Sequence, residues 1–150
     1  MSEFEPVDGS CLCGRVRFKV TPPSRFCAHC HCQNCRRAHG AAFVTWAGFE
    51  ESQVHVTAGE ERLQHYRTDT DATRSFCRDC GSTLFYRGPR WQGEIHVALA
   101  NLDGEIDRRP GSNVYVDHRA PWWKIEDDLP QYGGTTGVEH KDRASEGGES

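Results

Sequence analysis

The stretch CAHCHCQNC, residues 27–35, holds four cysteines and two histidines in nine positions. Thiolates and imidazoles are common protein ligands of Zn²⁺, and closely spaced cysteines let one short loop supply two or three ligands. Three interpretations follow: a redox centre, a closed structural metal site, or a metal ion that keeps one coordination position for a substrate. The cysteines elsewhere in the chain bear on this choice.

Two further cysteine pairs lie on either side of this stretch. The first pair, in CLC, is Cys11 and Cys13, and the second, in CRDC, is Cys77 and Cys80. One Zn²⁺ shared by both pairs would have the tetrahedral set of four thiolates that structural zinc sites use. Because the pairs lie far apart in the sequence, such an ion would stabilise the fold by about 4 kcal/mol if it acts as a cross-link. We predict a structural site here.

The middle stretch supplies three sulfurs within six residues, from Cys30, Cys32 and Cys35. The candidate fourth donors are Cys27, His29 and His31. Four protein ligands would close the site, whereas three would leave a position for water or for a substrate thiolate. The sequence leaves both arrangements open.

Composition narrows the compartment and the partners. The first ten residues, MSEFEPVDGS, are acidic and lack the features of a secretory or transit peptide, and no apolar run approaches the ~20 residues that cross a bilayer. We therefore expect a cytoplasmic protein without a membrane partner, in which eight cysteines serve metal binding rather than disulfides. A net charge of −4 argues against nucleic-acid binding.

Alternation of polar and apolar residues predicts a mainly β, single-domain chain. Residues 14–20 (GRVRFKV) and 93–101 (GEIHVALAN) each place apolar side chains on one face, which is typical of a half-buried strand. Further strands are predicted at residues 41–49, 52–59, 82–88 and 112–118, and a short turn or helix at 35–40, in a predominantly antiparallel β chain.

The C-terminal part divides into two segments of different composition. Residues 119–132 (RAPWWKIEDDLPQY) contain two tryptophans and are expected to close over the sheets as an apolar strap. Residues 133–150 have Val138 as their only large apolar side chain, so burial cannot offset the loss of chain entropy. We expect a zinc-binding domain at residues 1–132 and a disordered tail at residues 133–150.

Five motifs follow one another along residues 9–132. They are GSCLCGRVRF (9–18), CHCQNCRRAHG (30–40), FCRDCGSTLFY (76–86), ALANLDG (98–104) and DHRAPWWKIEDDLPQY (117–132). In this order they resemble the glutathione-dependent formaldehyde-activating enzyme and centromere protein V family. The resemblance implies a β-tent fold, in which small antiparallel sheets carry two zinc ions.

The resemblance also implies a role for each cysteine cluster. The structural zinc would be held by Cys11, Cys13, Cys77 and Cys80, and a second zinc, which meets a substrate thiol, by Cys30, Cys32 and Cys35. Cys27 lies outside the family motif and is a candidate fourth ligand that would close the second site.

The activity implied by the resemblance is that of a carbon–sulfur lyase acting on a thiol adduct, such as S-hydroxymethylglutathione, which glutathione and formaldehyde form. The partner would be a small thiol, and a monomer or weak dimer is expected. Arg36 and Arg37 directly follow the third sulfur ligand and could bind the carboxylates of such a thiol. They could equally offset the negative charge of three thiolates.

Cysteine clusters of this kind also occur in proteins that are not lyases. A non-catalytic zinc scaffold that binds a protein partner is the main alternative, because a fold does not fix a function. A nucleic-acid zinc module would need a basic surface, and a C-x-x-C redox protein would need its motif in a βαβ setting. The sequence shows neither feature. The number of protein ligands at the second ion separates the enzyme from the scaffold.

Overall fold

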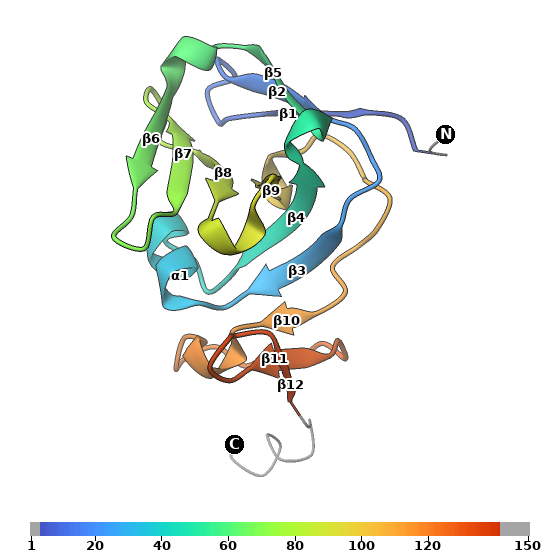
Figure 1. Cartoon of the computed structure of the whole chain (residues 1–150), viewed down its shortest axis with the longest axis vertical. Helices are drawn as coiled ribbons and strands as arrows, with labels where there is room; N and C mark the ends of the chain where they lie inside the picture. The colour runs from blue at the N-terminus through green and yellow to red at the C-terminus, as the bar shows by residue number, and fades with distance from the viewer. Residues whose placement is uncertain (1–3, 142–150) are drawn as a thin grey trace. The chain divides into compact units, whose positions relative to one another are not determined.

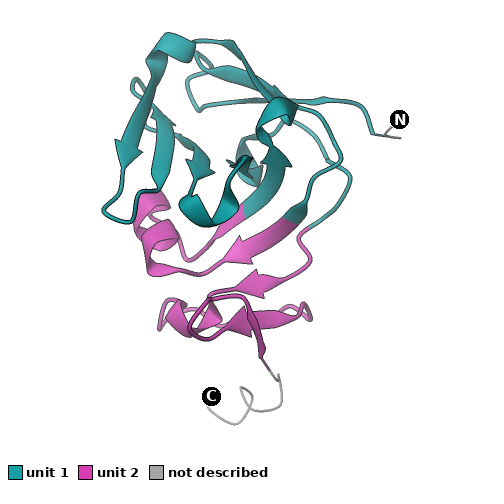
Figure 2. Cartoon of the chain, in the orientation of Figure 1, with its two compact units in different colours: residues 1–26, 46–109 teal, residues 27–45, 110–150 magenta. Residues whose placement is uncertain are grey.

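The computed structural model describes residues 4–141 (Figure 1). The chain divides into two compact units, residues 1–26 with 46–109 and residues 27–45 with 110–150 (Figure 2). It leaves the first unit within strand β3 (Phe26–Cys30), returns within β4 (Val44–Glu50) and leaves again after residue 109.

The first unit contains two antiparallel sheets. The smaller sheet consists of β1 (Val7–Ser10), β2 (Arg17–Val20) and β5 (Val54–Ala58), with β2 in the centre. The larger sheet has the order β4, β9 (Glu94–Ala98), β8 (Thr83–Arg87), β7 (Thr73–Cys77) and β6 (Leu63–Arg67). The short 3₁₀ turns are η1 (Glu51–Gln53), η2 (Glu60–Arg62), η3 (Pro89–Trp91) and η4 (Leu99–Asn101).

Apolar side chains at alternate positions form the core of the first unit. Val16, Phe18 and Val20 are at most 1% exposed. The ring of Phe18 in β2 meets the ring of Phe85 in β8 edge-on, with the ring centroids 5.0 Å apart. Full burial of each such side chain contributes roughly 1.5–3 kcal/mol to stability. The alternation in the sequence is thereby confirmed for β2.

The described residues of the second unit include one α-helix and four strands. Its strand order is β12 (Glu139–Lys141), β11 (Gln131–Gly133), β10 (Asn113–Val114) and β3; helix α1 (Gln33–His39) follows β3, and turn η5 (Val116–His118) follows β10. β10 pairs in parallel with both β3 and β11, so this unit departs from the antiparallel pairing expected. A long connection between β3 and β10 permits parallel pairing, which a tight hairpin does not.

The predicted class is confirmed, because the described chain is mainly β with a single α-helix among residues 4–141. No helix in this part of the chain combines the length and the apolar character that crossing a membrane requires.

Part of the expected disordered tail forms a hairpin. Gly133 ends β11, and β12 pairs with β11 in antiparallel fashion. Gly134 and Gly137, at φ values of +74° and +80°, shape the turn between these strands. Disorder was expected because the segment has few apolar side chains, but composition carries no information on backbone pairing between strands. The expectation is therefore wrong for residues 133–141, while residues 142–150 lie outside the described part.

The segment at residues 119–130 does not bury its tryptophans as expected. Trp122 is 71% exposed and Trp123 is 39% exposed. A polar contact holds the segment instead, because Asn113 Nδ2 donates to Asp127 Oδ1 at 2.9 Å. The expectation of an apolar strap is therefore wrong for Trp122.

Candidate metal centres

Four cysteine sulfurs converge in the first unit, in what we call the first centre. Cys11 and Cys13 lie between β1 and β2, Cys77 ends β7, and Cys80 lies in the turn before β8. Their four Sγ atoms lie within 4.8 Å of one another. The Sγ separation is 3.6 Å between Cys11 and Cys13 and 3.8 Å between Cys13 and Cys77.

These separations distinguish an ion site from a disulfide. A disulfide would bring two sulfurs to about 2.05 Å. Sulfurs bound to one tetrahedral Zn²⁺ at about 2.3 Å lie about 3.8 Å apart. None of the eight cysteines, all of which lie within residues 4–141, forms a disulfide. The first centre could therefore hold a metal ion, and its donor set is compatible with zinc.

Glycine turns direct the two cysteine pairs of the first centre toward a common point. Gly14 and Gly81 have φ values of +79° and +81°, which residues with a Cβ rarely adopt. The Gly81 N–H donates to the Cys77 carbonyl at 2.7 Å and closes the turn that carries Cys80. The glycines next to the cysteines are therefore part of the local geometry of the centre.

Ser82 connects the two cysteine pairs. Its hydroxyl oxygen accepts the N–H of Leu12 at 2.8 Å, so its hydrogen can point to Cys80 Sγ, 3.3 Å away. The N–H of Val16 donates in the same way to Cys11 Sγ at 3.3 Å. Donors of this kind stabilise thiolates and orient metal ligands.

The thiols of the first centre differ in their ease of ionisation. Burial raises the pKa of Cys77 to about 11. Burial acts in the same direction at Cys80, but hydrogen bonds from the Ser82 hydroxyl and from backbone N–H groups outweigh it and lower the pKa to about 5. At Cys11 the N–H of Val16 lowers the pKa against the effect of burial. Some of these thiols ionise readily, whereas others need the nearby positive charge that a divalent cation would supply.

Three further sulfurs converge in the second unit, in what we call the second centre. Cys30 ends β3, Cys32 caps the N-terminus of α1, and Cys35 lies in the first turn of that helix. Their Sγ atoms lie within 4.8 Å of one another. The Cys35 N–H donates to Cys32 Sγ at 3.2 Å, so this sulfur caps the helix and belongs to the cluster at the same time.

Crowding and burial oppose ionisation in the second centre. Hydrogen bonds with the sulfurs of Cys32 and Cys35, together with burial, raise the pKa of Cys30 well above its ordinary value. At Cys32 the hydrogen bond with Cys30 acts to lower the pKa, but Cys35 and burial outweigh it, and the pKa is raised. A divalent cation would favour the thiolates. The second centre could therefore hold a metal ion with three sulfur donors.

The structure does not bring a fourth candidate ligand into the second centre. Cys27 and Cys30 lie three positions apart in β3, and side chains at this spacing point to opposite faces of a strand. Among the described residues, the converging ligand atoms include none from Cys27, His29 or His31. Nδ1 of His29 pairs instead with Thr45 Oγ1 at 2.8 Å. The geometry therefore gives no support to Cys27 as the fourth ligand.

A buried histidine separates two of the candidate ligands. His31 is 1% exposed, and its Nε2 lies 2.8 Å from Asn113 Oδ1. Burial lowers the pKa of both His31 and His29, which favours neutral imidazoles. No motif spacing in the sequence links Asn113 or its partner Asp127 to the cysteines, so their contacts with His31 and with each other could not be predicted.

The two arginines after Cys35 differ in their contacts. Nε of Arg36 donates to the backbone carbonyl of His118 at 3.1 Å, while the Arg37 side chain is exposed. Arg36 thus joins α1 to η5. Binding of a substrate carboxylate by either arginine stays a prediction.

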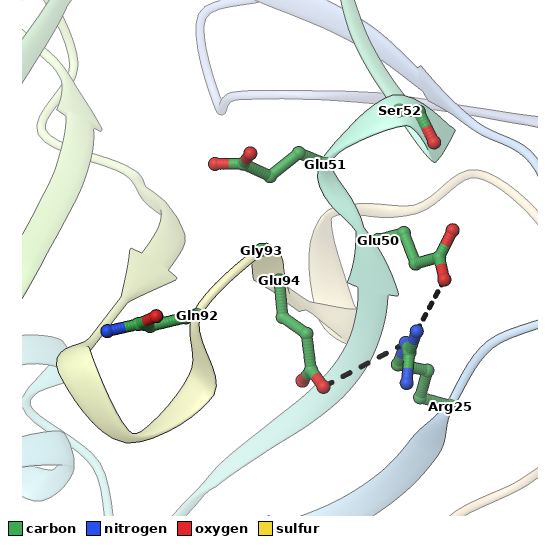
Figure 3. A pocket seen from close by; sticks show the side chains of 7 residues that line it. All are labelled: Arg25, Glu50, Glu51, Ser52, Gln92, Gly93 and Glu94. Carbon is green, nitrogen blue, oxygen red and sulfur yellow. Dashed lines mark hydrogen bonds and ion pairs between the residues drawn. The ribbon is translucent and has the colours of Figure 1, made fainter.

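An open pocket of about 380 Å³ lies in the first unit (Figure 3). It is lined by Arg25, Glu50, Glu51, Ser52, Gln92, Gly93 and Glu94. Arg25 forms ion pairs with Glu50 and Glu94, and Arg87 pairs with Glu51. None of the residues proposed from the sequence lines this pocket, and its carboxylates already have cationic partners.

Comparison with known proteins agrees with this geometry. The family model described as glutathione-dependent formaldehyde-activating enzyme matches residues 6–118. A protein of Halomonas elongata with the provisional name glutathione-dependent formaldehyde-activating enzyme is 28% identical over 127 residues, which is 80% of this chain and 81% of the relative. An uncharacterized lyase of Schizosaccharomyces pombe is 31% identical over 88 residues, 57% of this chain and 58% of the relative.

The fold also resembles that of a solved structure. The crystal structure of a Rhodobacter sphaeroides protein matches with a TM-score of 0.57 and 32% identity, over 67% of this chain and 92% of that one. Because the family model also spans most of the chain, the assignment is plain. The chain belongs to the family of glutathione-dependent formaldehyde-activating enzymes.

Proposed function

We propose that the protein is a zinc-dependent carbon–sulfur lyase that acts on a small thiol such as glutathione. The reaction joins the thiol to formaldehyde and gives S-hydroxymethylglutathione, or runs in reverse. The observation that supports this proposal most is the difference between the centres: four sulfurs converge in the first, but only Cys30, Cys32 and Cys35 in the second. Three protein ligands leave one position for a substrate.

The two centres would then have different roles. Zinc in the first centre would be structural, because four thiolates complete its tetrahedral shell. Zinc in the second centre, held by Cys30, Cys32 and Cys35, would favour the thiolate form of a bound thiol at neutral pH. The thiolate sulfur of the substrate attacks the carbonyl carbon of formaldehyde, a carbon–sulfur bond forms, and the carbonyl oxygen takes up a proton from solvent.

The substrate side of the proposal is a thiol that carries carboxylates. Arg37 has an exposed side chain two positions after Cys35 and could form a bidentate contact with such a group. Arg36 already donates to a backbone carbonyl through Nε, and its terminal nitrogens would provide the second contact. The names of the relatives, one with glutathione and formaldehyde and one with lyase, agree with this substrate and reaction.

A cytoplasmic location belongs to the same proposal, and so does a zinc-binding domain that covers residues 1–132 together with the hairpin of β11 and β12. A monomer or a weak dimer without nucleic-acid partners would suffice, because each chain carries both centres.

The second candidate function is a non-catalytic zinc scaffold for a protein partner. Two consecutive exposed indole rings favour it, those of Trp122 at 71% and Trp123 at 39%. Tryptophan is enriched at protein interfaces. A scaffold does not need a coordination position for a substrate on the second metal ion, whereas the enzyme does.

The proposal can be tested by NMR, which measures how fast glutathione and ¹³C-formaldehyde interconvert with S-hydroxymethylglutathione. The protein should accelerate exchange above the spontaneous rate, and Cys32→Ser should abolish the acceleration. Serine also caps helices, so this variant removes the sulfur and keeps the cap of α1. Cys27→Ala is the matched control and should keep the acceleration. Exchange at the spontaneous rate with the zinc-loaded wild type would exclude the proposed reaction and leave the scaffold.

A further inference from the structure

A chain of hydrogen bonds ends at the residue between two ligands of the second centre. Nε2 of His31 lies 2.8 Å from Asn113 Oδ1, and Asn113 Nδ2 donates to Asp127 Oδ1 at 2.9 Å. Because the amide hydrogen points to the carboxylate, the amide oxygen faces the imidazole and accepts from it. Nε2 of His31 therefore carries the ring proton.

This contact sets the orientation of the imidazole. The other ring nitrogen, Nδ1, has no hydrogen-bond partner within residues 4–141, and the side chain is 1% exposed. Loss of Asn113 Oδ1 would leave Nε2 as a second buried nitrogen of His31 without a partner, which is unfavourable. Asp127 is itself fixed, because its Oδ1 also accepts the N–H of Leu129 at 3.0 Å.

Backbone contacts tie the same residues together. The His31 N–H donates to the carbonyl of Val114 at 3.0 Å, and the Asn113 N–H donates to the carbonyl of Pro130 at 2.9 Å. Asn113 is 1% exposed and lies in β10, which pairs with β3. The position of His31 is thus determined by main-chain and side-chain bonds to the same neighbouring strand.

The position of His31 matters for the metal centre because its neighbours on both sides are candidate ligands. Consecutive Cα atoms are a fixed ~3.8 Å apart, so the placement of His31 restricts the Cα positions of Cys30 and Cys32. Thiolates that crowd together repel one another, and a ligand set held in place from outside binds an ion more tightly.

We propose that Asn113 and Asp127 are positioning residues of the second centre, which hold the His31 ring and thereby fix the sulfurs of Cys30 and Cys32 in their converged arrangement. The inference rests on the proposed function in one respect, namely that this centre binds an ion. Direct hydrogen-bond partners of metal ligands typically change metal affinity about 10- to 100-fold when they are removed, and Asn113 and Asp127 act one residue further away, through His31.

Metal titration of the full chain tests the inference, with ¹¹³Cd²⁺ as the NMR probe, since an ion with four sulfurs and an ion with three give separate signals. Asp127→Ala and Asn113→Ala should lower the affinity of the second centre about 10-fold, the lower end of the range for direct partners of ligands, and leave the first centre unchanged. Asp127→Asn keeps an oxygen acceptor for Asn113 and Leu129 and should restore most of the affinity. Glu126→Ala, which alters the adjacent exposed acid, is the matched control and should have no effect.

A second readout follows the imidazole directly. ¹⁵N NMR of His31 should show the Nε2–H tautomer in the wild type and a mixture of tautomers in Asp127→Ala. Wild-type affinity of the second centre in both alanine variants would overturn the inference, and so would an equal loss at both centres, which indicates general unfolding. A wild type that binds cadmium only in the first centre would instead overturn the proposed function, and the inference with it.

Discussion

Single side chains around the sulfurs determine how well each centre is organised. In the first centre Ser82 is the clearest case, because its hydroxyl accepts from Leu12 of one cysteine turn and faces Cys80 of the other. One oxygen atom thereby connects two turns that each carry a pair of sulfurs. Backbone N–H donors, such as that of Val16 to Cys11, have the same effect on one sulfur only.

Replacement of Ser82 should therefore weaken the first centre. We expect Ser82→Ala to lower its zinc affinity about 10- to 100-fold, because the thiolate donor and the contact with Leu12 are lost together. Competition with a chromophoric chelator measures this affinity. Ser82→Thr keeps the hydroxyl and should bind zinc nearly as well as the wild type. Equal affinities of the alanine and threonine variants would show that the hydroxyl has no such role.

A carboxylate in the second unit should make stability depend on pH. The N–H of Gly134 at 2.7 Å and the ammonium of Lys141 at 3.1 Å lower the pKa of Asp117, and His118 is a further nearby cation when protonated. A carboxyl with a lowered folded pKa stabilises the fold above the unfolded value of about 3.9, and this contribution is lost as the pH falls through the folded pKa.

Asp117→Asn should accordingly reduce the free energy of unfolding at pH 7. The difference between wild type and variant should begin to shrink below about pH 4, where the unfolded carboxyl takes up its proton, and should continue to shrink until the pH has passed through the lowered folded pKa of Asp117. Urea unfolding at pH 7 and pH 3 gives the two differences. A difference of the same size at both pH values would mean that the charge of Asp117 does not contribute.

At the scale of elements, tight turns next to the strands shape the first centre. Gly81 follows Cys80 at a φ of +81°, and a Cβ at this position would meet no atom within 4 Å. Backbone strain alone should therefore decide the effect of Gly81→Ala, and we expect a loss of about 1 kcal/mol in stability. Thermal unfolding of the zinc-loaded protein measures it.

Gly104→Ala is the matched control for Gly81→Ala. Gly104 does not have a positive φ, and its nearest atom to an added Cβ is Val7 Cγ1 at 3.7 Å, an ordinary contact. The control should change stability by less than Gly81→Ala. Equal effects of the two substitutions would mean that the left-handed turn is not what Gly81 contributes.

Sequence patterns predicted some elements and missed others for physical reasons. Alternation identified β2, where buried and exposed residues alternate, and it also identified β9, although four consecutive residues of β9 are buried. It missed β3, where Cys27, Ala28 and Cys30 are buried and burial does not alternate, and β12, which depends on main-chain pairing with β11. It also gave no sign that β10 pairs in parallel, since that pairing depends on residues far away in the sequence.

The candidate centres show the same contrast. Ligands that lie close together in the sequence, such as Cys30, Cys32 and Cys35, could be found from their spacing. Their supporting residues could not, because Asn113 reaches His31 from 82 positions away, and asparagine in a sequence carries no signal of such a contact.

At the scale of the whole molecule, the two centres should differ in their effect on stability. The first centre joins Cys13 and Cys77, which are 64 positions apart, whereas the second joins residues within one short loop. Closing a loop of about 64 residues removes much more entropy from the unfolded chain than closing a loop of a few residues. The first centre should therefore be the larger contributor to stability.

Cys77→Ser should accordingly destabilise the zinc-loaded protein more than Cys32→Ser does. We expect a loss of about 4 kcal/mol for the first variant and a clearly smaller loss for the second. Urea unfolding in reducing buffer, with and without a chelator, measures both. Chelation should abolish the difference between the wild type and Cys77→Ser. A larger effect of Cys32→Ser would contradict this assignment of roles.

X-ray absorption at the zinc edge, on protein purified under reducing conditions, tests the central claim most directly. We predict two zinc ions per chain, one with four sulfurs and one with three sulfurs and a lighter atom, and addition of glutathione should replace the lighter atom by a fourth sulfur. Cys27→Ala should leave this spectrum unchanged. Four protein sulfurs at both ions without glutathione, or a chain with no bound metal and paired half-cystines, would contradict the account.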